Sequence, residues 1–324
     1  MHVSFFRIMW IKEIKVIKFC RYFTQLWLVC LFNLYICFYN FTLCYYCFYF
    51  IYCSLSEMFL RSLVRLVVTK AAAESYMEYL QNADRELPAL SEIFPRHQSD
   101  TKELIQFHSL LSEVMQEHGF KYVGIKVVPP SATALRCLRA TDAICVPIFS
   151  NVTQKTSISV KQDRIQFVEP LFVMKLGCDP PTQMTASKSL SICDTFCPGV
   201  DLTGSRYPFY PPHTTGFAAD LGGTIAIHFG DNMNLTDGML ESLADHSFVM
   251  TREGEPIQVG SVKNCLGGPG AAVPLAVSYA SSIGLPLRAG HHILCNGVGS
   301  RTPALPGEYK VNFGVYGSVS VCVT

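Results

Sequence analysis

Two acidic residues stand inside apolar stretches of the sequence. Glu169 lies in residues 167–173 (FVEPLFV), and Asp201 lies in residues 200–202 (VDL). A carboxylate among apolar side chains is costly unless it has a partner. Carboxylate oxygens are also the ligands of hard cations such as Mg²⁺. The pattern therefore indicates that Glu169 and Asp201 could hold such an ion between them.

A lysine has a similar setting. Lys126 lies in residues 123–128 (VGIKVV), which are otherwise apolar or glycine. A lysine inside an apolar strand can have its pKa lowered enough to act as a base, or it can steer a carboxylate. The alternative is that Lys126, Glu169 and Asp201 lie on edge strands with their charges facing water. The residues alone leave both interpretations open.

Other reactive residues predict less chemistry. The cysteines of residues 58–324 are scattered and form no C-x-x-C pair, so we expect reduced, mostly buried thiols. The glycine-rich residues 265–270 (CLGGPG) lack the Gly-Lys-Ser/Thr ending of a phosphate loop and predict a turn. The sequence has no G-x-S-x-G elbow, and the adjacent His291 and His292 would point in opposite directions on a strand. A serine-hydrolase triad and a two-histidine metal site are therefore disfavoured.

Segments spread over residues 72–324 resemble one known family in order and spacing. Towards the C-terminus they are an apolar helix, a GLPLRAG turn, a glycine-rich loop, a Pro-Gly-Glu turn and a final GSVSV strand, at 276–280, 284–290, 296–299, 306–308 and 313–321. Upstream segments follow the same order, at 90–95, 124–126, 164–177 and 201–206. The sequence resembles the 2-keto-4-pentenoate hydratase and 4-oxalocrotonate decarboxylase branch of the fumarylacetoacetate hydrolase superfamily.

The resemblance implies a metal site and a set of catalytic residues. Members of this branch bind Mg²⁺ or Mn²⁺ through three carboxylates, and the ion polarises a 2-keto acid so that its enol becomes accessible. By position, Glu169 matches the first ligand and Asp201 the third. The resemblance also makes Lys126, Arg206 and Asp220 the candidates for substrate binding and proton transfer.

The sequence departs from the family pattern at the metal site. The second ligand position is Leu171, which cannot coordinate a cation, and Gly204 replaces an aspartate. Metal affinity should therefore fall unless water or Asp220 substitutes.

Three functions are compatible with this mixture. One is a hydro-lyase or decarboxylase acting on a small 2-keto acid through a divalent metal enolate. The alternative is a catalytically inactive member that serves as a structural subunit of a mitochondrial assembly. A related C–C bond hydrolase is a third, less favoured possibility.

The elements expected to position these residues are helices in the N-terminal part of residues 72–324 and mostly strands after them. Apolar residues at helical spacing predict helices over 72–82 and 101–119, and a helix over 272–283 is expected before Gly284. Apolar runs predict a strand over 122–128 and two strand-like stretches hinged at Pro170 within 163–176. Further short strands are expected after Gly216, at 223–229, 248–252, 292–296, 309–313 and 318–323. Regular β-α alternation is lacking, so the prediction is an α+β fold, a fumarylacetoacetate hydrolase-like mixed β-roll or sandwich with a helical N-terminal preface.

The chain divides unevenly by composition. It has 324 residues, of which 49% are hydrophobic, and a net charge of +1, so it lacks the basic excess of a nucleic-acid binder. Residues 1–57 are a hydrophobic leader, either a mistranslated upstream segment or a membrane anchor, and residues 58–71 resemble a mitochondrial transit segment. Residues 72–324 then form the hydratase-like domain.

We expect the protein to be a homo-oligomer located in the mitochondrial matrix or the cytoplasm. Contact with a membrane is expected only if the leader is part of the protein.

Overall fold

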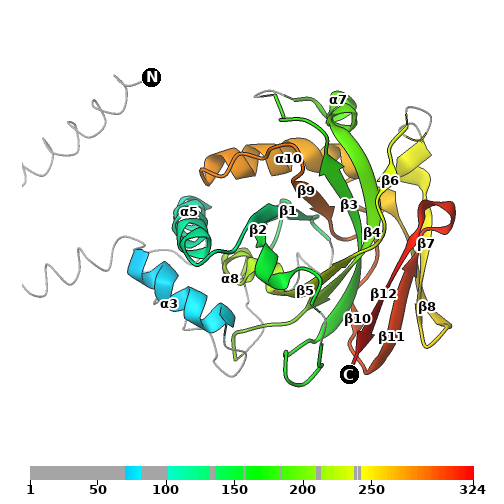
Figure 1. Ribbon diagram of the computed structural model, residues 1–324, viewed down its shortest axis with the longest axis horizontal. Helices are drawn as coiled ribbons and strands as arrows, with labels where there is room; N and C mark the ends of the chain where they lie inside the picture. Colours follow the sequence, from blue (N-terminus) through cyan, green and yellow to red (C-terminus); the bar gives the residue numbers. More distant parts are fainter. Residues whose placement is uncertain are drawn as a thin grey trace, which may run out of the picture. The chain divides into compact units, whose positions relative to one another are not determined.

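The computed structural model describes residues 70–81, 101–131, 136, 138–155, 158–181, 184–208, 213–236, 239 and 242–324. All of them belong to one unit, Arg65–Thr324 (Figure 1). The predicted leader, 1–57, and the predicted transit segment, 58–71 apart from its last two residues, lie outside the described residues. Segment 90–95 and Cys137 lie outside them as well.

An eight-stranded sheet carries the candidate residues. Its main path runs β2-β1-β9-β3-β4-β5, with β10 added beside β3 and β6 beside β4. The strands are β1 (Tyr122–Val128), β2 (Ile144–Phe149), β3 (Phe167–Leu176), β4 (Cys193–Thr203), β5 (Thr224–Phe229), β6 (Met233–Asn234), β9 (His292–Cys295) and β10 (Thr302–Pro303). Only the β1–β9 pair is parallel among these strands. A doubly wound parallel sheet is thereby excluded, as the sequence predicted.

A second sheet completes the β part. Its order is β12-β11-β7-β8 and every pair is antiparallel. The strands are β7 (Ser247–Arg252), β8 (Glu255–Ser261), β11 (Gly307–Asn312) and β12 (Ser318–Val323). Together with the helices, the two sheets make an α+β fold, as predicted from the sequence.

The side chains of the large sheet divide between two apolar clusters because strand residues alternate between its faces. On β1, Ile125 and Val127 join the cluster that also holds residues of the helix α10 (Pro269–Ser282). Lys126 points to the opposite face, where Leu171 and Leu294 belong to the other cluster. Helix α10 packs on β1 and β9, while α5 packs on β2 and α8 (Figure 1).

Helices cover the face on which Lys126 lies. They are α3 (Lys70–Gln81), α5 (Thr101–Glu117) and the short α8 (Thr214–Ala219). The predicted helices over 72–82 and 101–119 are thus confirmed within a few residues, as is that over 272–283. Gly119 has a φ of +84°, the left-handed conformation expected just beyond a helix end. A four-residue helix, α7 (Ala186–Ser189), was not predicted.

The prediction of two strand-like stretches hinged at Pro170 is wrong. β3 is one continuous ten-residue strand that pairs with β4 along its whole length. On its other side, β10 pairs with residues 167–168 and β9 with residues 172–175. Pro170 falls in the gap between these two partners, so the amide hydrogen that proline lacks is not needed for a ladder. The strand therefore passes through the proline unbroken.

Candidate functional site

The strand register brings the predicted acids together. Glu169 on β3 stands directly opposite Asp201 on β4. Lys126, from β1, places its Nζ atom 2.6 Å from Asp201 Oδ2, and both side chains are fully buried. β1, β3 and β4 all lie inside the sheet rather than at its edge. The alternative of edge-strand charges facing water is therefore wrong for all three residues.

Lys126 uses all of its hydrogen-bonding capacity inside the protein. Besides the contact with Asp201, Nζ donates to Gly222 O at 3.1 Å and to Thr224 Oγ1 at 2.9 Å. An ammonium group has three donors, and each has an acceptor here. The arrangement is that of a lysine paired with a buried carboxylate, with an acceptor for every donor.

Glu169 has its own cation, which the sequence did not reveal. Its Oε1 atom accepts from Thr203 Oγ1 at 2.7 Å and lies 3.0 Å from Arg301 Nε. The Arg301 guanidinium also lies 5.6 Å from the ring centre of Phe167 and 5.3 Å from that of Phe217. Burial acts to raise the pKa of Glu169, but Arg301 foremost, with Lys126 and Thr203, outweighs it and lowers that pKa. Glu169 is thus held as a carboxylate.

One polar atom of this cluster, Asp201 Oδ1, is buried and has no hydrogen bond within the part of the chain that the structure describes. The Asn296 side chain lies beside Glu169 and helps to lower the pKa of that carboxyl group. Burial raises the pKa of Asp201, and the attraction of Lys126 opposes that rise. Asn296 follows β9, where its backbone N–H donates to Val127 O at 3.0 Å.

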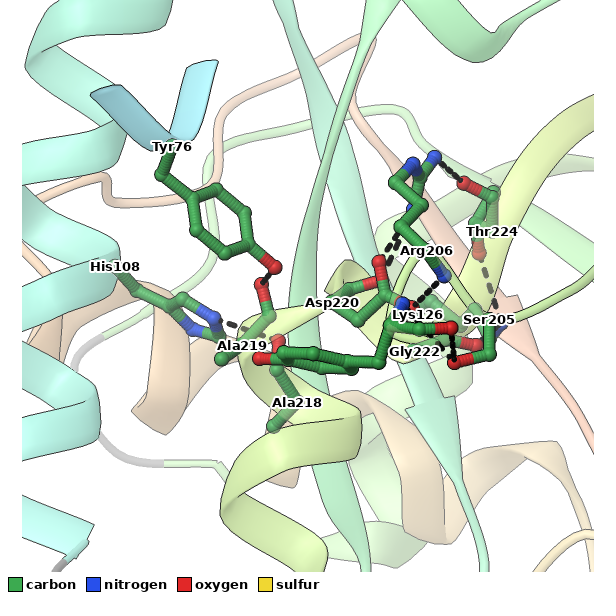
Figure 2. Close-up of polar contacts among 11 residues, drawn as sticks. Tyr76, His108, Lys126, Ser205, Arg206, Ala218, Ala219, Asp220, Gly222 and Thr224 are labelled. Atoms are coloured by element: carbon green, nitrogen blue, oxygen red, sulfur yellow. Dashed lines mark hydrogen bonds and ion pairs between the residues drawn. The ribbon is translucent and has the colours of Figure 1, made fainter. Parts of the chain in front are cut away.

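Arg206 and Asp220 bind each other. Arg206 Nη1 lies 2.7 Å from Asp220 Oδ1, and the Arg206 backbone N–H donates to Asp220 Oδ2 at 3.1 Å (Figure 2). Arg206 Nη2 donates to Thr224 O, so Thr224 joins this pair to Lys126. Burial raises the pKa of Asp220, and Arg206 counteracts the rise. The five residues predicted for the site are therefore close together, but each charge already has a partner.

The C-terminal end of α8 is held through its backbone carbonyls. The Tyr76 hydroxyl, from α3, donates to Ala219 O, and His108 Nε2, from α5, lies 2.9 Å from Ala218 O (Figure 2). Gly222, whose O atom binds Lys126, has a φ of +69°. A Cβ at this position would meet Lys126 Nζ at 3.2 Å. Glycine thus provides both the turn and the close approach of the lysine.

His108 is neutral in the folded chain. Burial lowers its pKa from 6.5 to about 4. Because a carbonyl can only accept, Nε2 must carry the hydrogen that Ala218 O receives. Nδ1 is then the acceptor for the Tyr279 hydroxyl at 2.6 Å.

The donor set does not fit the implied Mg²⁺ or Mn²⁺. Leu171 is fully buried at the second ligand position and offers no oxygen. Asp220, the possible substitute, is bound by Arg206. Among the residues described, no three His, Cys, Asp or Glu side chains gather closely enough to hold a metal ion. Hard cations need several oxygen ligands, and here two carboxylates face two cations of the chain itself.

Some of these residues could have been predicted and others could not. Thr203 lies two residues after Asp201 on one strand, which places both on the same face. Arg301 lies outside the strands, in the connection between β9 and β10, and no periodicity relates it to Glu169. Only the folded connection brings its guanidinium to the site.

Comparison with known proteins gives two kinds of relative. No known family model matches the sequence. REH2-associated factor 2 of Trypanosoma brucei brucei (strain 927/4 GUTat10.1) is 66% identical over 267 residues, which make up 82% of this chain and 100% of that protein. The 2-keto-4-pentenoate hydratase of Paraburkholderia xenovorans (strain LB400) is 26% identical over 254 residues, 76% of this chain and 92% of the hydratase.

The fold has a solved counterpart. The 4-oxalocrotonate decarboxylase from Pseudomonas putida G7, complexed with magnesium and adipate, superimposes with a TM-score of 0.69. The match covers 80% of this chain and 99% of the decarboxylase at 18% sequence identity. At that identity the likeness concerns the fold.

Proposed function

We propose that this chain, which belongs to the family of REH2-associated factor 2 within the hydratase and decarboxylase branch of the fumarylacetoacetate hydrolase superfamily, is a non-catalytic member that works by associating with another protein. The resemblance drawn from the sequence is confirmed at the level of this branch. The proposal selects the structural-subunit alternative over the hydro-lyase or decarboxylase.

One observation carries the proposal. Leu171 replaces a carboxylate at the centre of the site, and Lys126 and Arg301 neutralise the two acids that remain. Binding a divalent ion between Glu169 and Asp201 would require these buried ion pairs to separate. Breaking a buried pair costs about 3–5 kcal/mol, because it leaves an uncompensated charge in the interior. The site therefore favours its own cations over a metal.

The 66% identity with REH2-associated factor 2 supports association as the function. That protein is named for its association with REH2. We expect the full chain to bind the REH2 of its own cell directly. Co-expression of the two proteins, followed by gel filtration of the purified pair, should show one comigrating complex. Separate elution at micromolar concentrations of both proteins would contradict the association.

Catalysis is tested on the same preparation. The full chain, with Mg²⁺ or Mn²⁺ and 2-hydroxypenta-2,4-dienoate, should cause no loss of the dienol beyond the uncatalysed rate. The Glu169→Gln variant serves as the matched control. Turnover by the parent chain that disappears in Glu169→Gln would overturn the non-catalytic assignment.

The hydro-lyase or decarboxylase is the second candidate, and a specific observation favours it. Lys126, Glu169 and Asp201 converge as the resemblance implied, and Asp201 Oδ1 has no partner in the described part of the chain. In that case a small 2-keto acid would be the substrate and a divalent ion, Mg²⁺ or Mn²⁺, the cofactor. The turnover assay decides between the two candidates.

The homo-oligomer and the mitochondrial matrix or cytoplasmic location belong to the proposal as well. Light scattering on the full chain measures the first, and microscopy of a C-terminally tagged chain measures the second. A C-terminal tag leaves the predicted transit segment, 58–71, unmodified.

A further inference from the structure

We infer that Arg301 is a resident cation that takes the place of the divalent ion in this chain, so that restoring a carboxylate at position 171 alone does not restore full metal affinity. The inference rests on the proposed function, because it concerns the same site in its non-catalytic form. It identifies the residue that, besides Leu171, makes the site unsuitable for a metal.

Among the residues that the structure describes, the charges around the two acids are balanced without an ion. Glu169 and Asp201 bring two negative charges to neighbouring positions on β3 and β4, and Lys126 and Arg301 bring two positive ones. Arg206 and Asp220 neutralise each other separately. A divalent cation added to this buried group would leave an excess of two positive charges, and a buried excess charge is strongly unfavourable.

The Arg301 side chain is held in place by several contacts at the site. Its Nε atom lies 3.0 Å from Glu169 Oε1, and its guanidinium lies near the rings of Phe167, at the start of β3, and Phe217, in α8. Cation–π contacts and a charge-assisted hydrogen bond hold the group from different sides. The side chain is 23% exposed, whereas those of Lys126 and Asp201 are fully buried. Arg301 is therefore the more accessible of the two cations that face the acids.

The charge count predicts an order of metal affinities. Leu171→Glu alone gives the group one excess negative charge, and so does Arg301→Met alone. The double variant Leu171→Glu/Arg301→Met has two excess negative charges and three carboxylates, so one divalent ion makes it neutral. The double variant should bind Mn²⁺ most tightly, each single variant more weakly, and the parent chain least.

Calorimetric titration of the full chain with Mn²⁺ tests this order. We expect no saturable binding by the parent and at least about tenfold tighter binding by the double variant than by Leu171→Glu. Leu171→Glu/Arg301→Lys, which keeps the charge, should bind as weakly as Leu171→Glu. Arg288→Met, which removes the cation of an exposed pair with Asp179, is the matched control and should behave like the parent.

Three results would overturn the inference: equal binding by Leu171→Glu and the double variant, no binding by the double variant, or tight binding by the parent. If the double variant is unfolded without metal, folding on addition of Mn²⁺ supports the inference and persistent unfolding contradicts it. Association and turnover are measured on the parent chain, so a failure of the proposed function is separate from a failure here.

Discussion

At the scale of single residues, the site is a set of mutually satisfied charges. Lys126 has three acceptors, Glu169 has a threonine and an arginine, and Arg206 and Asp220 form a closed pair. Such networks stabilise the interior only while they are complete, because each remaining charge loses its compensation when one partner is removed. The residues of the site should therefore matter to stability whether or not they perform chemistry.

Replacing Lys126 tests this directly. Lys126→Met should lower the free energy of unfolding by about 3–5 kcal/mol, because Asp201 is then buried without a partner. The double variant Lys126→Met/Asp201→Leu should recover most of the loss, since it removes both charges. Urea unfolding at pH 7 measures both values.

The matched control is Lys70→Met, which removes the cation of an exposed pair with Glu117 and should change stability little. A loss in Lys126→Met no larger than that in Lys70→Met would contradict the interpretation of a buried, compensated pair.

At the scale of elements, β1 owes its place beside β9 to a glycine. Gly124 pairs with His292 in the one parallel ladder of the large sheet, and a Cβ at Gly124 would lie 1.8 Å from His292 O. The Gly-x-Lys spacing thus has a physical reason, because the glycine lets β9 approach and the lysine two residues later points to the helix-covered face. α5 and α3 close that face through His108 and Tyr76.

The buried His108 predicts how stability depends on pH. Its pKa is about 4 in the folded chain and 6.5 ordinarily, so the unfolded chain takes up the proton first as pH falls. His108 should therefore lower the free energy of unfolding by about 3 kcal/mol as pH falls from 6.5 to 4. Below pH 4 its contribution should no longer change.

Urea unfolding of the parent and of His108→Gln across this pH range isolates the contribution. The raised pKa of Asp201 acts in the opposite direction, since protonation then favours the folded chain, but it is common to both proteins. Parallel stability curves for parent and variant would contradict the assignment of a neutral, buried His108.

The limits of sequence-based prediction are visible at this scale. The helix over 101–119 was predicted because its apolar residues repeat at helical spacing, and the strand over 122–128 because it is a short apolar run. β4 was missed, because a proline and a glycine interrupt its apolar pattern. Glu169 and Asp201 were found from their apolar surroundings, but Arg301 reaches Glu169 through the tertiary fold of a connection, which no local pattern encodes.

At the scale of the whole molecule, the fold is similar to that of an enzyme, but the candidate site does not suit the metal ion that the resemblance implies. The fold is similar to that of a 4-oxalocrotonate decarboxylase, while the site has Leu171 where the resemblance implies a carboxylate and carries two compensating cations. No helix within the described ranges is long and apolar enough to cross a membrane. Under the proposed function, the fold is kept for the surface that it presents to another protein.

This separation predicts that association is insensitive to the chemistry of the site. Glu169→Gln removes a buried charge but nothing from the outer surface, so its affinity for REH2 should stay within about twofold of that of the parent. Calorimetric titration of REH2 with both proteins measures the ratio, and circular dichroism verifies that the variant is folded. A tenfold weaker complex from a folded variant would tie association to the site.

The carbonyl contacts of Tyr76 and His108 have a consequence for how the domain opens. Ala218 and Ala219 immediately precede the turn whose Gly222 carbonyl binds Lys126. The N-terminal helices and the strand β1 therefore both form hydrogen bonds with the same short segment. Detaching either helix would free that segment and loosen the lysine with it. We therefore expect the helical preface and the sheet to unfold together, without a stable intermediate in which the helices alone are unfolded.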